Sequence, residues 1–204
     1  MDTQSAYSKV LNRIKGHERG WVFTPSHFKD IGNRSGVALA LMRHTKAGTI
    51  RQIARGLYDY PRQHPKLGIL SPSVDAVARA LAGRDAIRLQ PAGGYAANLL
   101  GLSEQVPMKI IFLTDGPTRN VPVGNQTVTL KKTTPKIMAT AGKVSGLVIQ
   151  ALRHLGRRHV DNAVIDHLRK RLSEDDKRQL LHDLTFAPAW IATEMRRIAA
   201  AEKF

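Results

Sequence analysis

One short stretch carries basic and hydrogen-bonding residues at a spacing that would place them on a single helix face. Apolar or ring side chains recur along residues 34–46 at i, i+3, i+4 and i+7, which predicts a helix with one buried side. The buried residues would be Val37, Ala40, Leu41 and His44. The other side has the chemistry of nucleic-acid recognition, because Arg and Lys bind phosphates while Arg, Asn and Ser hydrogen-bond base edges. We expect DNA contacts from Asn33, Arg34, Ser35, Ala38, Leu39, Met42, Arg43 and Lys46.

A change of period after Gly48 indicates a β-hairpin next to this helix. Residues 49–53 alternate as a strand does, Arg55-Gly56 is a turn sequence, and residues 57–60 predict a second short strand. Such a hairpin lies beside the DNA backbone when the helix occupies the major groove. We therefore expect Arg51, Gln52 and Arg55 to reach phosphates or the minor groove.

The elements that must position these residues precede them in the chain. A helical apolar face over residues 7–14 is followed by a strand-like segment at 21–23 and a short helix over 25–30, with Thr24-Pro25 at its start. The order helix, strand, helix, helix, strand, strand predicts a winged helix-turn-helix, with its centre at Trp21–Tyr60. Two alternatives stay open: a small mixed subdomain with a merely solvated basic surface, and a winged helix that binds protein.

Composition restricts the classes of protein to be considered. The 204 residues carry a formal net charge of +16, and the chain has no cysteine, so disulfides, thiol catalysis and cysteine-ligated metals are excluded. No apolar run reaches about 18 residues, and residues 1–20 do not resemble a secretory signal, so we expect a cytoplasmic protein that makes no membrane contact. Such a charge attracts any polyanion, including RNA and anionic lipid, so it does not by itself select DNA.

The basic charge is concentrated toward the N-terminus. Residues 1–67 hold 12 Lys or Arg against 4 acids, whereas the twice longer remainder holds 20 against 12. Pro, Gly and Ser cluster over residues 61–72, which predicts a linker or crossing segment. We expect an α+β fold: a winged helix-turn-helix domain over 1–66, then a mixed domain over 67–204. This second domain would hold a small sheet, with strands at 108–114 and 126–131, and helices from about residue 143.

Several residue groups in the second domain have the types that chemistry requires but not the spacing. Gly93-Gly94-Tyr95 lacks the Lys and Ser or Thr of a phosphate-binding loop, and His154 and His159 lack the spacing of a zinc-binding helix. Asp175-Asp176 stands where a helix start favours negative charge. The sequence therefore predicts a protein that is not an enzyme and has no metal site or cofactor.

Two basic clusters occur on predicted helices of the second domain. They are a solvated face, a further phosphate contact or a docking surface for an acidic partner, and the sequence does not separate these roles. The clusters consist of Arg153, Arg157 and Arg158, with His154 among them, and of Arg169, Lys170 and Arg171.

Ordered blocks of the chain resemble a known family over most of its length. The blocks are Arg55–Pro61, Gln90-Pro91, Gly94–Leu102, Leu113–Pro117 and Gly142–Leu147. They are similar to the AbiEi-type antitoxins of bacterial type IV toxin–antitoxin systems. The resemblance implies a winged helix that binds operator inverted repeats in its own promoter and represses its operon. It also implies a C-terminal domain that counters an AbiEii-type nucleotidyltransferase toxin, either by binding it or by opposing its effect on the cellular target.

Some features depart from that pattern, and other functions stay open. His44 stands at a core-facing position where an aliphatic residue is usual. Ala38, Leu39 and Met42 are apolar on the reading face, where they can contact thymine methyl groups but make no bidentate hydrogen bonds. The alternatives are a toxin-neutralising interaction module in which the winged helix contacts protein or RNA, and a plain repressor without a toxin partner.

Overall fold

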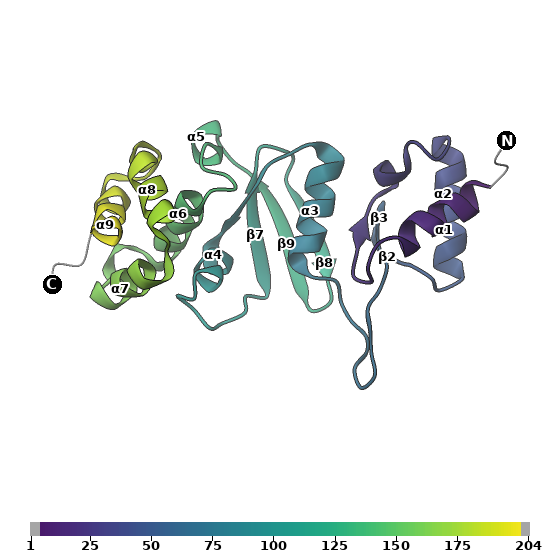
Figure 1. The fold of residues 1–204 in the computed structure, drawn as a ribbon, viewed down its shortest axis with the longest axis horizontal. Coiled ribbons are helices and arrows are strands. Elements are labelled where there is room, and N and C mark those ends of the chain that lie inside the picture. Colours follow the sequence, from purple (N-terminus) through teal and green to yellow (C-terminus); the bar gives the residue numbers. More distant parts are fainter. Residues whose placement is uncertain (1–4, 201–204) are drawn as a thin grey trace. The chain divides into compact units, whose positions relative to one another are not determined.

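The computed structural model describes residues 5–200 of the chain, and Figure 1 shows their fold. Helices and small sheets of short strands make up this part of the chain, so the protein has the α+β fold that the sequence predicts. The chain divides into two compact units. The first unit is Met1–Ile87 with Val121–Val128, and the second unit is Arg88–Asn120 with Thr129–Phe204.

The first unit begins with two helices and a three-stranded sheet. In chain order the elements are α1 (Ala6–Lys15), β1 (Val22–Phe23), the 3-10 helix η1 (Pro25–Phe28), α2 (Arg34–Lys46), β2 (Arg51–Ala54) and β3 (Leu57–Asp59). The sheet has the order β1-β3-β2 with antiparallel pairs. Its core is fully buried, with Val10 and Ile14 of α1 packed among Phe23, Phe28 and Leu41. This element order is the one expected from the sequence.

The helix that carries the expected contact residues has the predicted bounds. Its first residue is Arg34, its last is Lys46, and the Asn33 side chain caps it by accepting a 2.8 Å hydrogen bond from the Gly36 amide. The buried side consists of Val37, Ala40, Leu41 and His44, as the periodicity predicts. The turn between β2 and β3 has Gly56 at a φ of 71°, which glycine adopts at little cost.

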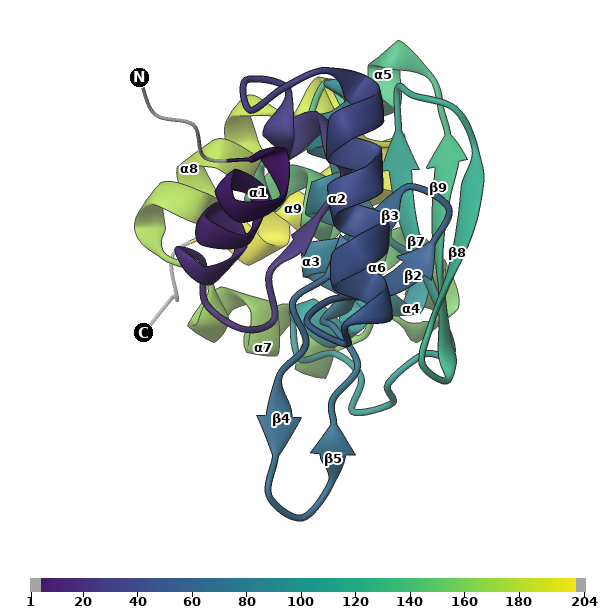
Figure 2. The same ribbon diagram turned by 90° about the vertical axis from the view of Figure 1, so that its right-hand side faces the viewer.

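The segment expected to be a linker contains a second hairpin instead. Strands β4 (Gln63–His64) and β5 (Gly68–Ile69) pair antiparallel, and Figure 2 shows them projecting from the sheet and helices of the first unit. Helix α3 (Val74–Asp85) follows, capped by Ser73. Two-residue strands are too short to produce a readable alternation, so the sequence pattern gave no sign of this hairpin.

The second unit contains most of a four-stranded sheet and a helical bundle. The sheet has the order β6-β7-β9-β8, built from β6 (Leu89–Ala92), β7 (Lys109–Thr114), β8 (Arg119–Val123) and β9 (Gln126–Lys132). The helical elements are α4 (Gly93–Leu99), α5 (Pro135–Met138), α6 (Val144–Leu155), η2 (Arg157–His159), α7 (Asn162–Arg171), α8 (Glu174–His182), η3 (Leu184–Phe186) and α9 (Ala189–Ala199). The sequence predicts β7, β9 and the helical end, but not β6 and β8.

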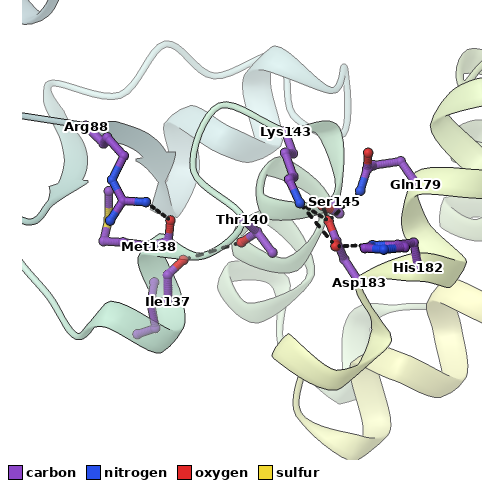
Figure 3. Close-up of polar contacts among 9 residues, drawn as sticks. All are labelled: Arg88, Ile137, Met138, Thr140, Lys143, Ser145, Gln179, His182 and Asp183. Carbon is purple, nitrogen blue, oxygen red and sulfur yellow. Dashed lines mark hydrogen bonds and ion pairs between the residues drawn. The ribbon is translucent and has the colours of Figure 1, made fainter.

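A buried carboxylate ties the start of α6 to the end of α8 in the second unit (Figure 3). Asp183 has no solvent exposure and accepts hydrogen bonds from Ser145 at 2.5 Å, Gln179 at 2.8 Å and the His182 ring at 2.9 Å. The Lys143 ammonium lies 3.3 Å from both carboxylate oxygens. Serine, histidine and aspartate are the residues of a hydrolase triad, but here the serine hydroxyl donates directly to the carboxylate and not to the histidine, which is not the order of contacts in a triad.

These bonds make the stability of the second unit sensitive to acid. Burial raises the pKa of the Asp183 carboxyl, but the bonds from Ser145, His182, Gln179 and Lys143 outweigh burial and hold that pKa below its ordinary value. Because the folded-state pKa is the lower one, protonation favours the unfolded chain. The stabilisation is therefore complete above about pH 4 and is lost as the pH falls toward the folded-state pKa.

We predict that Asp183→Asn lowers the free energy of unfolding at pH 7 and flattens its dependence on pH below about 4. Urea unfolding at a series of pH values measures both effects. Asp175→Asn is the control, because the Asp175 side chain is exposed and its partner is the neighbouring Arg178. A pH dependence that is the same in Asp183→Asn and in the unchanged protein would contradict this account.

Gly146 in α6 marks a close approach between the helix and the chain that precedes it. A Cβ atom on Gly146 would lie within 3.0 Å of the Thr140 carbonyl oxygen, the Thr140 hydroxyl and the buried Gln90 side chain. The Thr140 carbonyl belongs to the backbone, so it cannot turn away as a flexible side chain would. By contrast, Gly83 in α3 has no atom within 4 Å of the same position.

We predict opposite effects of alanine at these two helical glycines. Gly146→Ala should destabilise the protein by about 1–3 kcal/mol through overpacking. Gly83→Ala should stabilise it by about 0.5–1 kcal/mol, because alanine is the better helix former where space is open. Urea unfolding of both variants is the measurement, and a Gly146→Ala variant at least as stable as the unchanged protein would show that the close approach is not a packing constraint.

Candidate nucleic-acid interface

The expected contact residues of α2 lie together on its exposed side. Arg34, Ser35 and Arg43 are exposed, as are Ala38, Leu39, Met42 and Lys46. Asn33 is exposed too, but its side-chain oxygen is used in capping the helix, which leaves its amide nitrogen as a donor. The structure thus brings these eight residues onto one continuous face.

His44 has a structural part in positioning that face. Its ring is buried, stacks on Tyr7 with ring centroids 3.9 Å apart, and has Nε2 3.0 Å from the Tyr7 carbonyl oxygen. A carbonyl only accepts, so Nε2 carries the proton and donates. His44 therefore attaches α2 to α1 by one stacking contact and one directional bond, where an aliphatic residue would offer packing alone.

Arg51 binds groups of the protein itself, whereas the sequence led us to expect contact with phosphates or the minor groove. Its guanidinium donates to both carboxylate oxygens of Asp59, at 3.1 and 2.6 Å, and to the Leu70 carbonyl at 2.9 Å. The hydrogen bond to Asp59 raises the pKa of Arg51 above its ordinary value. Asp59 is only 1% exposed, so losing Arg51 would leave a buried charge. Gln52 and Arg55 are exposed on the same hairpin, so their side chains are accessible for the contacts expected from the sequence.

Residues 31–74, which include α2 and both hairpins, contain no exposed acid. Between residues 31 and 74 the chain has seven Lys or Arg residues, and its one acid is the buried, paired Asp59. Asp30, just before this stretch, accepts two 2.6 Å hydrogen bonds from Arg13, which lower the pKa of that carboxyl to about 2. Residues 31–74 therefore carry a net positive charge, which suits a polyanion.

A hollow of about 370 Å³ adjoins the start of α2. Lys29 and Arg34 stand at its lining, together with Pro25, Ser26, Gly32 and Val37. Sequence reasoning did not include Lys29, nor Arg62 and Lys66 of the second hairpin. The signal that would have found Arg62 and Lys66 is the absence of acids from residues 60–74, which is visible in the sequence itself.

The basic clusters of the second unit are less uniform than the sequence suggested. Arg153, Arg157, Arg158 and Lys170 are exposed. Arg169 is paired with Asp166 and donates to the Arg197 carbonyl, while Arg171 donates to the Leu99 carbonyl at 3.1 Å. The second cluster therefore serves partly to join helices, whereas Arg153, Arg157 and Arg158 of the first extend into solvent without an ion pair to residues 5–200.

The described residues form neither a metal centre nor a membrane-spanning helix. Among residues 5–200, no three His, Asp or Glu side chains come together in a way that could hold a metal ion. In the same range, every helix is too short or too polar to cross a membrane.

These observations define an α+β protein whose first unit exposes a basic face on a helix and its neighbouring hairpins. The chain belongs to the family of unknown function DUF6088, whose model matches residues 9–180. That match covers both units and assigns no role to any residue. No curated protein matches the chain.

We predict that the two arginines of the first hairpin differ in their effect on stability. Arg51→Ala should lower the free energy of unfolding by about 2–3 kcal/mol, somewhat less than for a fully buried pair because the arginine is partly exposed. Arg55→Ala should change it by no more than about 0.5 kcal/mol. Urea unfolding measures both, and an Arg51→Ala variant as stable as Arg55→Ala would mean that the Asp59 pair contributes nothing.

Proposed function

We propose that the protein binds duplex DNA through a winged helix-turn-helix formed by α1 to β3, with α2 as the recognition helix and β2–β3 as the wing. The observation that carries the proposal is the charge of residues 31–74, which hold seven Lys or Arg and one acid, and that acid is buried against Arg51. A solvated surface needs no such one-sided charge. A helix-turn-helix places its second helix in the major groove, which is where the exposed face of α2 would read bases.

The side chains of this face divide into two kinds of contact. Arg34, Ser35 and the Asn33 amide lie at the start of α2, where recognition helices read base edges. Arg43, Lys46 and, on the wing, Gln52 and Arg55 would contact phosphates or the minor groove. Ala38, Leu39 and Met42 are exposed and apolar, and they would contact thymine methyl groups.

We further propose that this DNA binding serves an antitoxin of the AbiEi type. The support is the resemblance of the ordered blocks, which implies repression of its own operon through inverted repeats in the promoter. It also implies that residues 67–204 counter a cognate nucleotidyltransferase toxin, directly or at the toxin's target. The exposed cluster of Arg153, Arg157 and Arg158 is a candidate surface for an acidic partner in that role.

We predict that the protein binds its own upstream DNA more tightly than random duplex, and that the wing contributes through phosphates. Arg55→Ala should reduce the magnitude of the salt slope of binding by about one and weaken all sequences alike. Fluorescence anisotropy over a range of salt concentrations is the measurement. Arg196→Ala, an exposed arginine in α9, is the control that should leave the slope unchanged. Equal affinity for upstream and random DNA would rule out a role as a sequence-specific repressor.

Repression and antitoxicity can be separated in the full-length chain. We expect Arg34→Glu/Arg43→Glu to abolish operator binding while cells that carry the adjacent toxin gene remain protected. Reporter expression and growth measure the two functions. If protection disappears together with DNA binding, the recognition face itself neutralises the toxin by contacting protein or RNA. If the neighbouring gene encodes no nucleotidyltransferase, the protein is a repressor without a toxin partner.

A further inference from the structure

The β4–β5 hairpin exposes an apolar residue at its tip. Leu67 is 71% exposed, and Ile69 on β5 is exposed as well. The His64 ring nitrogen Nδ1 accepts 3.2 Å hydrogen bonds from the amides of Lys66 and Leu67. Those two bonds shape the turn, so the Leu67 side chain is presented by an ordered loop.

The base of the hairpin is fastened to the three-stranded sheet and the loop before it. Arg19 donates to the Pro61 carbonyl at 2.9 Å, and Arg62 donates to the Arg19 carbonyl at 2.8 Å. On the other strand, the Leu70 amide bonds the Arg62 carbonyl at 2.9 Å, and the Leu70 carbonyl accepts from Arg51. The hairpin projects from the rest of the first unit, as Figure 2 shows. The hydrogen bonds at the base of both strands hold it in place, so its tip is preorganised for binding.

The charge of the hairpin selects the kind of partner. Residues 60–74 contain Arg62, His64 and Lys66 and no acid, and the hairpin belongs to the unit that bears the recognition face. A basic stem with an apolar tip matches the minor groove, whose phosphates border apolar sugar walls and whose base steps accept leucine as a wedge. The minor groove is also the groove next to the major groove that α2 would occupy.

We infer that the β4–β5 hairpin is a second DNA-binding arm, separate from the wing, which places Leu67 in the minor groove and Lys66 on its phosphates. This inference rests on the proposed function and extends it, because it adds an element to the footprint of α2 and the wing. Arg51 then has a part in binding without touching DNA, since its bond to Leu70 holds the arm.

The test compares acidic substitutions at two equally exposed apolar residues of the full-length protein. Leu67→Asp should weaken affinity for the upstream duplex about tenfold, the loss of one good contact. Val106→Asp in the second unit, where the native side chain is 70% exposed, adds the same charge and should change affinity little. Lys66→Ala should reduce the salt slope by about one, and Lys136→Ala should not. Netropsin, a minor-groove ligand, should compete with the unchanged protein more strongly than with Leu67→Asp.

The possible failures are distinguishable. If the unchanged protein binds no duplex, the proposed function is wrong, and this inference is wrong with it. If the unchanged protein binds duplex DNA but Leu67→Asp and Val106→Asp weaken its affinity equally, the hairpin is not a DNA-binding arm, and the proposed function stands. Loss of binding to phosphatidylserine vesicles in Leu67→Asp, with duplex affinity intact, would assign the tip to a membrane instead and overturn the inference. Thermal melts verify that each variant is folded.

Discussion

The first unit depends on one ion pair that removes an acid from an otherwise basic surface. Asp59 is buried at the end of β3, and Arg51 donates to both of its oxygens while also holding the Leu70 carbonyl. The pair therefore joins β2 to β3 in the three-stranded sheet, and Arg51 at the same time holds the end of the second hairpin. A buried carboxylate without a cation would destabilise the fold, so Arg51 is needed as the partner of Asp59 and is not free to bind a phosphate.

The second unit uses the same physical solution with different partners. Asp183 is buried where α6 begins and α8 ends, and it is neutralised by Lys143 and solvated by three hydrogen-bond donors in place of water. Asp183 joins segments that are distant in the sequence, whereas in the first unit Arg51 links the carboxylate of its own hairpin to Leu70 of the second. Apolar packing supplies most of the stabilisation, and these directional bonds select one arrangement of the elements.

The helix and hairpin of the first unit were predictable, but the role of Arg51 was not. The 3.6-residue period gives the bounds and buried side of α2, because both follow from the local sequence alone. A two-residue turn at Arg55-Gly56 would place Gln52 opposite Asp59, but the register shifts between Gln52 and Ala54, so Arg51 faces Asp59. No local sequence pattern predicts such a bulge. The β4–β5 hairpin was not predicted for a related reason. Hydrogen bonds from Arg19 and Arg51 hold it, and neither residue lies within it.

The blocks that carry the family resemblance are largely explained by packing. In Gly142–Leu147, Lys143 and Ser145 bind Asp183, and Gly146 permits a close backbone approach. In Leu113–Pro117, Asp115 accepts hydrogen bonds from the Arg88 amide and guanidinium. These residues fix how the second unit folds, so a chain could share them and differ in what it binds. If the protein binds DNA as proposed, specificity then lies in exposed residues outside those blocks, such as those on the exposed side of α2 and at the tip of the second hairpin.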